Sequence, residues 1–410
     1  MHVLFVPSWY STIDKPWRGA FFHDQARALK RLGLQVGLAF VERRSLSRLT
    51  PSALAESHFQ IDCSQESDIP TLRMKGWSTF AQTTLGSLAW SQLMRHLVKS
   101  YAARYGVPDL IHAQSAMWGG WAGMRAAQDL GRPYVITEHS SSILMGRLAG
   151  GDLSRARRIY QRAAGVMAVS TVLGRSVDRI AGTPLCEVVP NAVDPDFFTL
   201  PPVPRTSAAR FLSVGDLIPG KRIDLLIRAF ARLRQRQPGA RLVIVGSGRE
   251  EPHLRQWVHA LALDEAVEFT GPLSRSGVRQ QMWKASALVL PSDCETFSVV
   301  LIEALSTGLP VLATRCGGPE EILTPELGIL IDRDDLDGLA DGMRKIVTGP
   351  FNPLRLHELA VRQYGFRTVA ERIFSIYERV ARRRPAPLHI SAPLRASASL
   401  REMRKERSGI

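Results

Sequence analysis

The chain has 410 residues, 45% of them hydrophobic, and a formal net charge of +15. This length and composition indicate a globular protein with an ample core, organised in two domains. A membrane span is excluded because no uncharged run approaches the roughly 18 residues that one needs. The opening MHVLFVP favours a short strand over a signal peptide.

Four cysteines are spread along the chain without close pairs: Cys63, Cys186, Cys294 and Cys316. This spacing suggests neither a disulfide framework nor a zinc site. We therefore expect reduced thiols and a cytoplasmic location.

The positive charge is unevenly distributed. Residues 1–190 hold 22 Lys and Arg against 13 Asp and Glu, residues 191–380 hold 23 of each, and residues 381–410 hold 8 against 2. A basic first half suggests an anionic partner, such as a membrane surface, nucleic acid or a phosphorylated substrate. Five arginines lie within residues 147–162. They are typical of a solvated helix face, and a surface for an anionic acceptor or lipid headgroups is the alternative.

The first half begins with an apolar strand, a polar loop, a helix and a second strand, which is the start of a β-α-β unit. The expected strands are residues 2–6 and 35–40. Gly19, just before the helix, would let the backbone approach a ligand closely, although a simple turn explains it equally well. Residues 43–80 are irregular and polar, with a strand expected only around 71–74.

A polar cluster follows a later strand of this half. We expect strands at 109–113 and 134–137, on either side of a helix at 119–130, and the second strand runs into Thr137-Glu138-His139-Ser140. Open parallel sheets place their chemistry at the carboxyl ends of such strands. His139 is therefore a candidate site residue, with a hydrogen-bonded structural histidine as the alternative.

A second α/β domain is expected after the proline-rich linker at 200–207. Its Gly246-Ser247-Gly248 turn lacks the third glycine of a dinucleotide fingerprint. The expected strands are 211–214, 241–245, 267–270, 287–291 and 310–314. The loops that follow them predict one crevice, formed by Lys221, Glu295, Glu303 and the backbone amides of Phe297, Ser298 and Val299.

Two carboxylates, Glu295 and Glu303, flank the start of a helix that we expect to begin near Phe297. Free amides and the helix dipole favour an anion at that point. Glu303 lies about six residues further along, roughly 9 Å at 1.5 Å per residue, so each carboxylate could address one end of a ligand with a phosphate in its middle. The helix is apolar almost all round, and a glutamate buried in it needs a partner. A surface glutamate and an ordinary helix cap are the alternatives.

The chain ends in a helix expected at about 366–383 and a basic tail, 384–410, without periodicity. The composition of the tail is typical of disorder, with a short helix possible at 399–407.

The order and spacing of several segments resemble family 4 of the retaining glycosyltransferases. Together these segments cover about residues 1–382. They are VLFVPSWY and GAFFHDQARALKRLG near the start, Thr137-x-His139, AVS at 168–170, VPNAVDPDFF at 189–198, VGDLIPGKRIDLLI at 214–227, and Glu295-x7-Glu303 with Gly308-Leu309-Pro310-Val311 and Gly317-Gly318.

The resemblance implies an α/β fold of the GT-B type, with two Rossmann-like domains facing across a cleft and a C-terminal helix crossing back to the first. Residues 1–198, with the helix at about 366–383, would bind the acceptor, and residues 199–365 the nucleotide-sugar donor. Such enzymes retain the anomeric configuration and need neither a bound metal nor another cofactor. The implied partners are a UDP- or GDP-sugar and a glycan or lipid-linked acceptor of surface polysaccharide synthesis, at the inner membrane face. Nucleic acid is not expected.

The resemblance also implies a role for each candidate residue. Glu303 would take the ribose hydroxyls, and Glu295 the hydroxyls of the transferred sugar. His139 would bond a sugar hydroxyl near the reacting carbon, which makes His139 and Glu295 the catalytic candidates. Gly19 would shape the loop over the diphosphate, which would be held by Lys221 and the amides of Phe297, Ser298 and Val299.

Two positions depart from the family pattern. Asp216 stands where many members have arginine, and a carboxylate there cannot hold phosphate. Glu295-Thr296-Phe297-Ser298 replaces Glu-Gly-Phe-Gly, so side chains stand where two glycines are frequent and the phosphate's approach would be tighter. A weak or inactive member is therefore an alternative.

Two other functions compete with this one. A sugar-nucleotide epimerase would share the GT-B fold, but we would not expect it to carry the N-x-V-D block at 191–194 together with Glu-x7-Glu. A non-catalytic basic protein that binds membrane or nucleic acid would interleave aromatic residues with Lys and Arg on one face. The sequence contains no such pattern.

Overall fold

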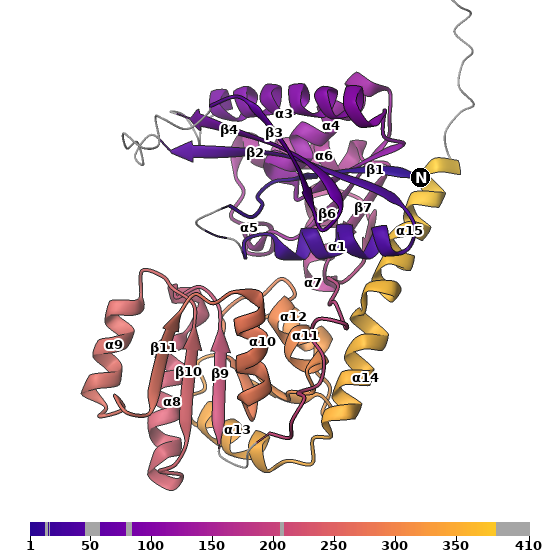
Figure 1. The fold of residues 1–410 in the computed structure, drawn as a ribbon. Helices are drawn as coiled ribbons and strands as arrows, with labels where there is room; N and C mark the ends of the chain where they lie inside the picture. The colour runs from indigo at the N-terminus through magenta and orange to yellow at the C-terminus, as the bar shows by residue number, and fades with distance from the viewer. Residues whose placement is uncertain (13–14, 16, 46–57, 79–83, 206–208, 383–410) are drawn as a thin grey trace, which may run out of the picture.

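Two β-sheets flanked by helices make up the protein (Figure 1). The computed structural model describes residues 1–12, 15, 17–45, 58–78, 84–205 and 209–382. Both sheets are parallel apart from one antiparallel edge strand, β3. The mixed α/β class with two parallel-sheet domains, predicted from the sequence, is confirmed.

The first sheet has the strand order β3-β4-β2-β1-β5-β6-β7-β8. Its central strands are buried along their whole length, as expected where helices cover both faces of a parallel sheet. The strands are β1 (His2–Pro7), β2 (Gln35–Ser45), β3 (Ile61–Glu66), β4 (Ile69–Ser78), β5 (Leu110–Gln114), β6 (Tyr134–Glu138), β7 (Gly165–Ala168) and β8 (Cys186–Val188). The helices are α1 (Ala20–Arg31), α3 (Thr84–Tyr105), η2 (Ala116–Gly120), α4 (Trp121–Leu130), α5 (Ser141–Leu144), α6 (Gly150–Arg162) and α7 (Thr171–Ala181).

The second sheet has the order β11-β10-β9-β12-β13-β14 and is parallel throughout. Its strands are β9 (Arg210–Val214), β10 (Arg241–Val245), β11 (Val267–Gly271), β12 (Ala287–Leu290), β13 (Val311–Thr314) and β14 (Gly328–Ile331). Its helices are η3 (Pro219–Lys221), α8 (Ile223–Arg236), α9 (Glu251–Ala260), α10 (Arg275–Lys284), α11 (Val299–Ser306), α12 (Gly318–Ile322) and α13 (Leu336–Thr348).

Two C-terminal helices, α14 (Pro353–Tyr364) and α15 (Phe366–Arg382), run along one side of both domains (Figure 1). The apolar face of α15 is buried in the same core as β1 and α1 of the first domain. At its centre, the Tyr377 hydroxyl lies 2.6 Å from Nδ1 of the buried His112. The last helix therefore crosses back to the first domain, as predicted.

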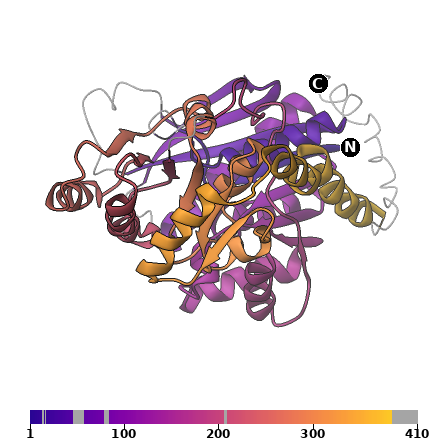
Figure 2. The ribbon, with the colours of Figure 1, turned by 90° about the horizontal axis from the view of Figure 1, so that it is seen from below.

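The carboxyl end of the second sheet meets the first domain, which lies behind it when the molecule is seen from below (Figure 2). The Glu321 carboxylate of α12 accepts hydrogen bonds from the backbone amides of Thr171 and Val172, at 2.8 and 3.0 Å. These amides open α7, so a carboxylate of one domain caps a helix of the other.

The segment 43–80 is more regular than predicted. Strand β2 extends to Ser45, and the strand expected at 71–74 is the middle of β4, which pairs with both β2 and β3. The prediction missed β3 because its residues, IDCSQE, are polar and mostly exposed at the sheet edge, so they show no apolar alternation. Residues 46–57 and the tail at 384–410, with its helix at 399–407, lie outside the described residues.

Candidate functional site

Lys221 and Glu295 meet at the carboxyl end of the second sheet. Lys221 ends η3, after β9, and its Nζ lies 2.5 Å from Oε1 of Glu295, which follows β12. The same oxygen accepts a hydrogen bond from the Ser292 hydroxyl at 2.8 Å. The Glu295 backbone is fixed as well, because its N–H donates to Cys316 O and its carbonyl accepts from Gly318 N. The Gly317-Gly318 turn thus holds Glu295 against Lys221.

Two carboxylates surround the single ammonium of Lys221. Burial lowers its pKa, but Glu295 and then Asp216 outweigh that effect, so the pKa of Lys221 lies above its ordinary value. Lys221 is therefore charged at neutral pH, and its charge is already balanced by Glu295. Asp216 adds a negative charge in place of the cation that is frequent in the family pattern.

Helix α11 begins at Val299, two residues later than predicted. The Phe297 ring is buried edge-on against Tyr364, at 5.6 Å between centroids, so only the backbone of Phe297 is available to a ligand. Ser298 precedes the helix with φ 78° and ψ 86°, a left-handed conformation that glycine adopts more readily. The first amides of α11, on Val299 and Val300, have no acceptor within the helix.

Glu303 lies on α11 with its side chain 15% exposed. Among the described residues its carboxylate accepts no hydrogen bond, and its one ion pair is with Arg275, 3.6 Å away. Burial raises the pKa of Glu303 to about 7, with Arg275 lowering it and Asp24 raising it further. The partner that the sequence required is therefore a single cation, which leaves most of the carboxylate's capacity to accept hydrogen bonds unused.

His139 and Gly19 lie in the first domain and are joined through Phe22. Gly19 caps α1 with φ 73°, and a Cβ there would lie 3.0 Å from the Phe22 ring, which packs edge-on against the His139 imidazole. His139 is 6% exposed; its Nε2 lies 2.7 Å from Gln114 Oε1, and its buried Nδ1 has no partner among the described residues. Burial holds the pKa of His139 well below its ordinary value. This histidine is neutral, with one ring nitrogen free.

Glu138 is a site residue that the sequence-based prediction missed. Its fully buried carboxylate accepts hydrogen bonds from the amides of Ala116, His139 and Ser140 and from the Tyr160 hydroxyl, at 2.7 to 2.9 Å. It therefore fixes the turn that carries His139. A charged residue within a strand of five buried positions, YVITE, was the available signal.

No cluster of three or more His, Cys, Asp or Glu side chains that could hold a metal ion occurs within the described part of the chain. None of its helices is long and apolar enough to cross a membrane.

Two family models match the chain in succession. The model for glycosyltransferase family 4 matches residues 19–197, and the model for glycosyl transferases group 1 matches residues 202–362. The chain belongs to glycosyltransferase family 4.

Curated relatives of this glycosyltransferase are distant. A subunit of the phosphatidylinositol N-acetylglucosaminyltransferase of Homo sapiens is 30% identical over 62% of this chain and 54% of the human protein, so the match spans about half of that relative. The putative teichuronic acid biosynthesis glycosyltransferase TuaC of Bacillus subtilis is 27% identical over 84% of this chain and 89% of TuaC.

Solved structures share the fold. Sucrose-phosphate synthase from Thermosynechococcus elongatus has a TM-score of 0.74 at 19% identity, covering 93% of this chain and 99% of that one. Anabaena HepE in complex with UDP has a TM-score of 0.70 at 20% identity, covering 92% and 100%. The GT-B architecture expected from the sequence is confirmed.

Proposed function

We propose that this glycosyltransferase moves a sugar, with retention of the anomeric configuration, from a UDP- or GDP-sugar to a glycan or lipid-linked acceptor of a surface polysaccharide. The observation that carries the proposal is the grouping at one sheet end of a charged lysine, the free amides of α11 and two largely buried carboxylates. This set has a donor or acceptor for each part of a nucleoside-diphosphate sugar.

The chemistry demands stabilisation of a leaving diphosphate. Negative charge grows on the β-phosphate as its bond to the anomeric carbon breaks, and fixed donors stabilise that charge best. Lys221 and the amides at the start of α11 fill this role, in which case no bound metal is needed. The Phe297 side chain takes no part, because it is buried in the core.

The carboxylates and the histidine orient the sugar nucleotide. Glu303, which lacks hydrogen-bond donors, accepts from the ribose hydroxyls, and Glu295 accepts from the transferred sugar. The neutral His139 lies beside the transferred sugar and bonds one of its hydroxyls near the reacting carbon. Gly19 lets the loop before α1 pass over the diphosphate.

The relatives support the substrate classes. HepE has been solved with UDP and with UDP-glucose, and Arabidopsis thaliana starch synthase IV with ADP and acarbose. TuaC is named as a putative glycosyltransferase of teichuronic acid biosynthesis, and we place this chain in a similar biosynthetic role.

A thermal-shift screen with UDP, GDP and ADP, alone and as sugar conjugates, tests the donor site. We expect one nucleotide and its sugar conjugates to raise the melting temperature of the wild type, and the rise to be lost in Glu303→Ala. If no nucleotide stabilises the protein and Glu303→Ala behaves as wild type, the donor site is not where we place it.

A further inference from the structure

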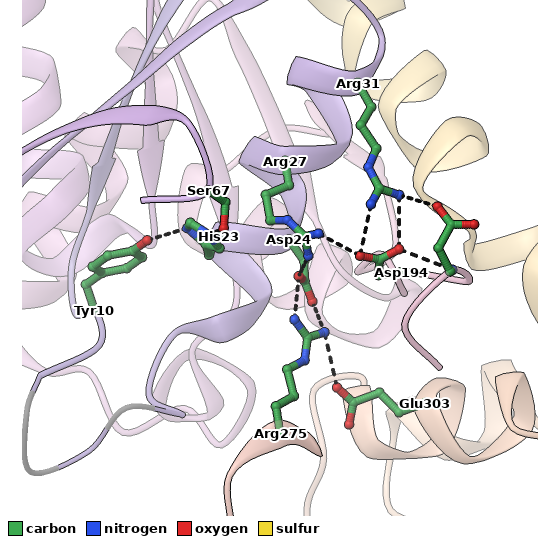
Figure 3. Close-up of polar contacts among 10 residues, drawn as sticks. Tyr10, His23, Asp24, Arg27, Arg31, Ser67, Asp194, Arg275 and Glu303 are labelled. Atoms are coloured by element: carbon green, nitrogen blue, oxygen red, sulfur yellow. Dashed lines mark hydrogen bonds and ion pairs between the residues drawn. The ribbon is translucent and has the colours of Figure 1, made fainter. Parts of the chain in front are cut away.

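The Arg275 guanidinium lies between carboxylates of the two domains (Figure 3). Its Nη1 donates to Oδ1 of Asp24 at 2.7 Å, and its Nη2 bonds the second oxygen of the same carboxylate. Nη2 also lies 3.6 Å from Oε1 of Glu303. Asp24 belongs to α1 of the first domain, whereas Arg275 and Glu303 belong to α10 and α11 of the second.

The local structure of α10 gives no reason for this cation. Arg275 is the first residue of the helix, where a positive charge opposes the helix dipole. Its guanidinium instead packs on Phe197 and Phe198, with Cζ 5.4 and 5.1 Å from the ring centroids. The two parallel bonds to Asp24, whose side chain is 1% exposed, fix the plane of the guanidinium. Arg275 is therefore rigidly held, and its rigid contact is with the opposite domain.

Glu303, in contrast, is held by its ion pair with Arg275, but its carboxylate accepts no hydrogen bond from the described residues. A separation of 3.6 Å is an ion pair and too long for a hydrogen bond. A largely buried carboxylate without donors is costly, and it is a good acceptor for any hydroxyl that reaches it. Arg275 faces one oxygen and leaves the other open.

We propose that Arg275 is a positioning residue for the donor site, holding Glu303 so that its carboxylate meets the two vicinal hydroxyls of the ribose. Because Asp24 fixes Arg275, helix α1 of the first domain sets the orientation of a nucleotide-binding group in the second. The inference rests on the proposed function, in which Glu303 binds ribose.

Calorimetric titration of the full chain with a nucleoside diphosphate and with its 2′,3′-dideoxy form tests the proposal. The probe is whichever of UDP, GDP or ADP binds the wild type. Arg275→Met keeps an unbranched apolar stem and removes the guanidinium with its charge. We expect it to weaken binding of the ribose nucleotide about tenfold, the size of a lost charge-assisted contact, and to leave binding of the dideoxy nucleotide unchanged.

Arg279→Met is the matched control. Arg279 lies one turn further along α10 and also packs on Phe197, donating to its carbonyl oxygen at 2.8 Å, but among the described residues no ion pair or hydrogen bond joins it to Asp24 or Glu303. The Arg279→Met variant should bind both nucleotides with the affinity of the wild type. If Arg275→Met fails to fold by circular dichroism, Arg275→Lys is measured instead; its point charge cannot bridge both carboxylates, so a smaller loss of the same selectivity is expected.

Two further variants separate positioning from simple stability. In the Glu303→Gln background, Arg275→Met should add no further loss, because the group that it positions has been changed. Asp24→Asn should also weaken the ribose nucleotide selectively. Equal losses for ribose and dideoxy nucleotides, full additivity with Glu303→Gln, or wild-type binding by Arg275→Met would overturn the proposal. A wild type that binds none of the three nucleotides would instead refute the proposed function.

Discussion

Ser298 occupies a backbone conformation, φ 78° and ψ 86°, that costs an L-residue free energy. The resemblance to the family pattern places glycine there, and the geometry explains why. Ser298→Gly should therefore raise the free energy of unfolding by about 0.5–1 kcal/mol in a urea titration. The control Ser375→Gly, on an exposed position of α15, should lower it by a similar amount because glycine weakens a helix interior. A loss of stability in both variants would contradict this account of Ser298.

Asp216 places a second negative charge beside the single ammonium that we assign to the diphosphate. Asp216→Asn removes that charge without changing the shape of the loop, so it should tighten nucleoside-diphosphate binding about fivefold, a Coulomb effect near 1 kcal/mol for partly screened charges. Calorimetric titration measures it. Asp264→Asn is the control, since Asp264 pairs with the exposed His259 instead. Unchanged affinity in Asp216→Asn would show that Asp216 does not oppose the phosphate.

Glu303 makes the stability depend on pH. Burial raises its folded pKa to about 7, above the unfolded value near 4.3. A group whose pKa is raised on folding contributes stability that is fully present when the pH is below its unfolded-state pKa. That contribution is lost as the pH rises through its folded-state pKa. Glu303→Gln cannot ionise, so its unfolding free energy relative to wild type should increase between pH 5 and pH 8 by up to about 3 kcal/mol. Urea titrations at both pH values test this, and a pH-independent difference would argue against a strained carboxylate.

At the scale of elements, the contacts that could be predicted from the sequence are those that local sequence patterns determine. Lys221 and Glu295 follow different strands of one parallel sheet, and such loops converge at its carboxyl end, so their meeting was predictable. The contact of Asp24 with Arg275 was not, because 251 residues separate them and the packing of two domains decides it. The start of α11 was misplaced by two residues because the left-handed turn at Ser298 cannot be read from a serine.

Helix α15 ties the end of the chain to the first sheet through a buried hydrogen bond. Tyr377 bonds His112, a histidine kept neutral by burial, which lowers its pKa to about 3. Tyr377→Phe leaves His112 Nδ1 without its partner and should cost about 1–3 kcal/mol of unfolding free energy in urea. Tyr105→Phe is the control, because the Tyr105 hydroxyl has no hydrogen-bond partner among the described residues. Equal stability of the two variants would mean that water replaces the tyrosine.

At the scale of the whole molecule, the two halves of the chain differ in net charge, and they also differ in the substrate that we assign to them. Residues 1–190 carry a net +9, from 22 basic and 13 acidic residues, whereas residues 191–380 are neutral with 23 of each. The neutral half carries the proposed donor site, and the basic half is the side on which we place the acceptor. Within α6, Arg155 pairs with Asp152 and Arg157 donates to Ile180 O, while Arg158 and Arg162 are exposed.

This division predicts that the protein binds anionic membranes through its first half. Vesicles containing phosphatidylglycerol should pellet the full chain at low salt, and vesicles of phosphatidylcholine alone should not, because screening and lipid charge govern such contacts. A chain ending at residue 382 should still bind, more weakly, having lost the net +5 of residues 383–410, from 7 basic and 2 acidic residues. In that shortened chain, Arg158→Glu with Arg162→Glu should abolish pelleting. The matched pair Arg232→Glu and Arg234→Glu, on α8 of the second domain, should leave it intact. Equal loss in both pairs would indicate that net charge alone, and no particular face, draws the protein to the lipid.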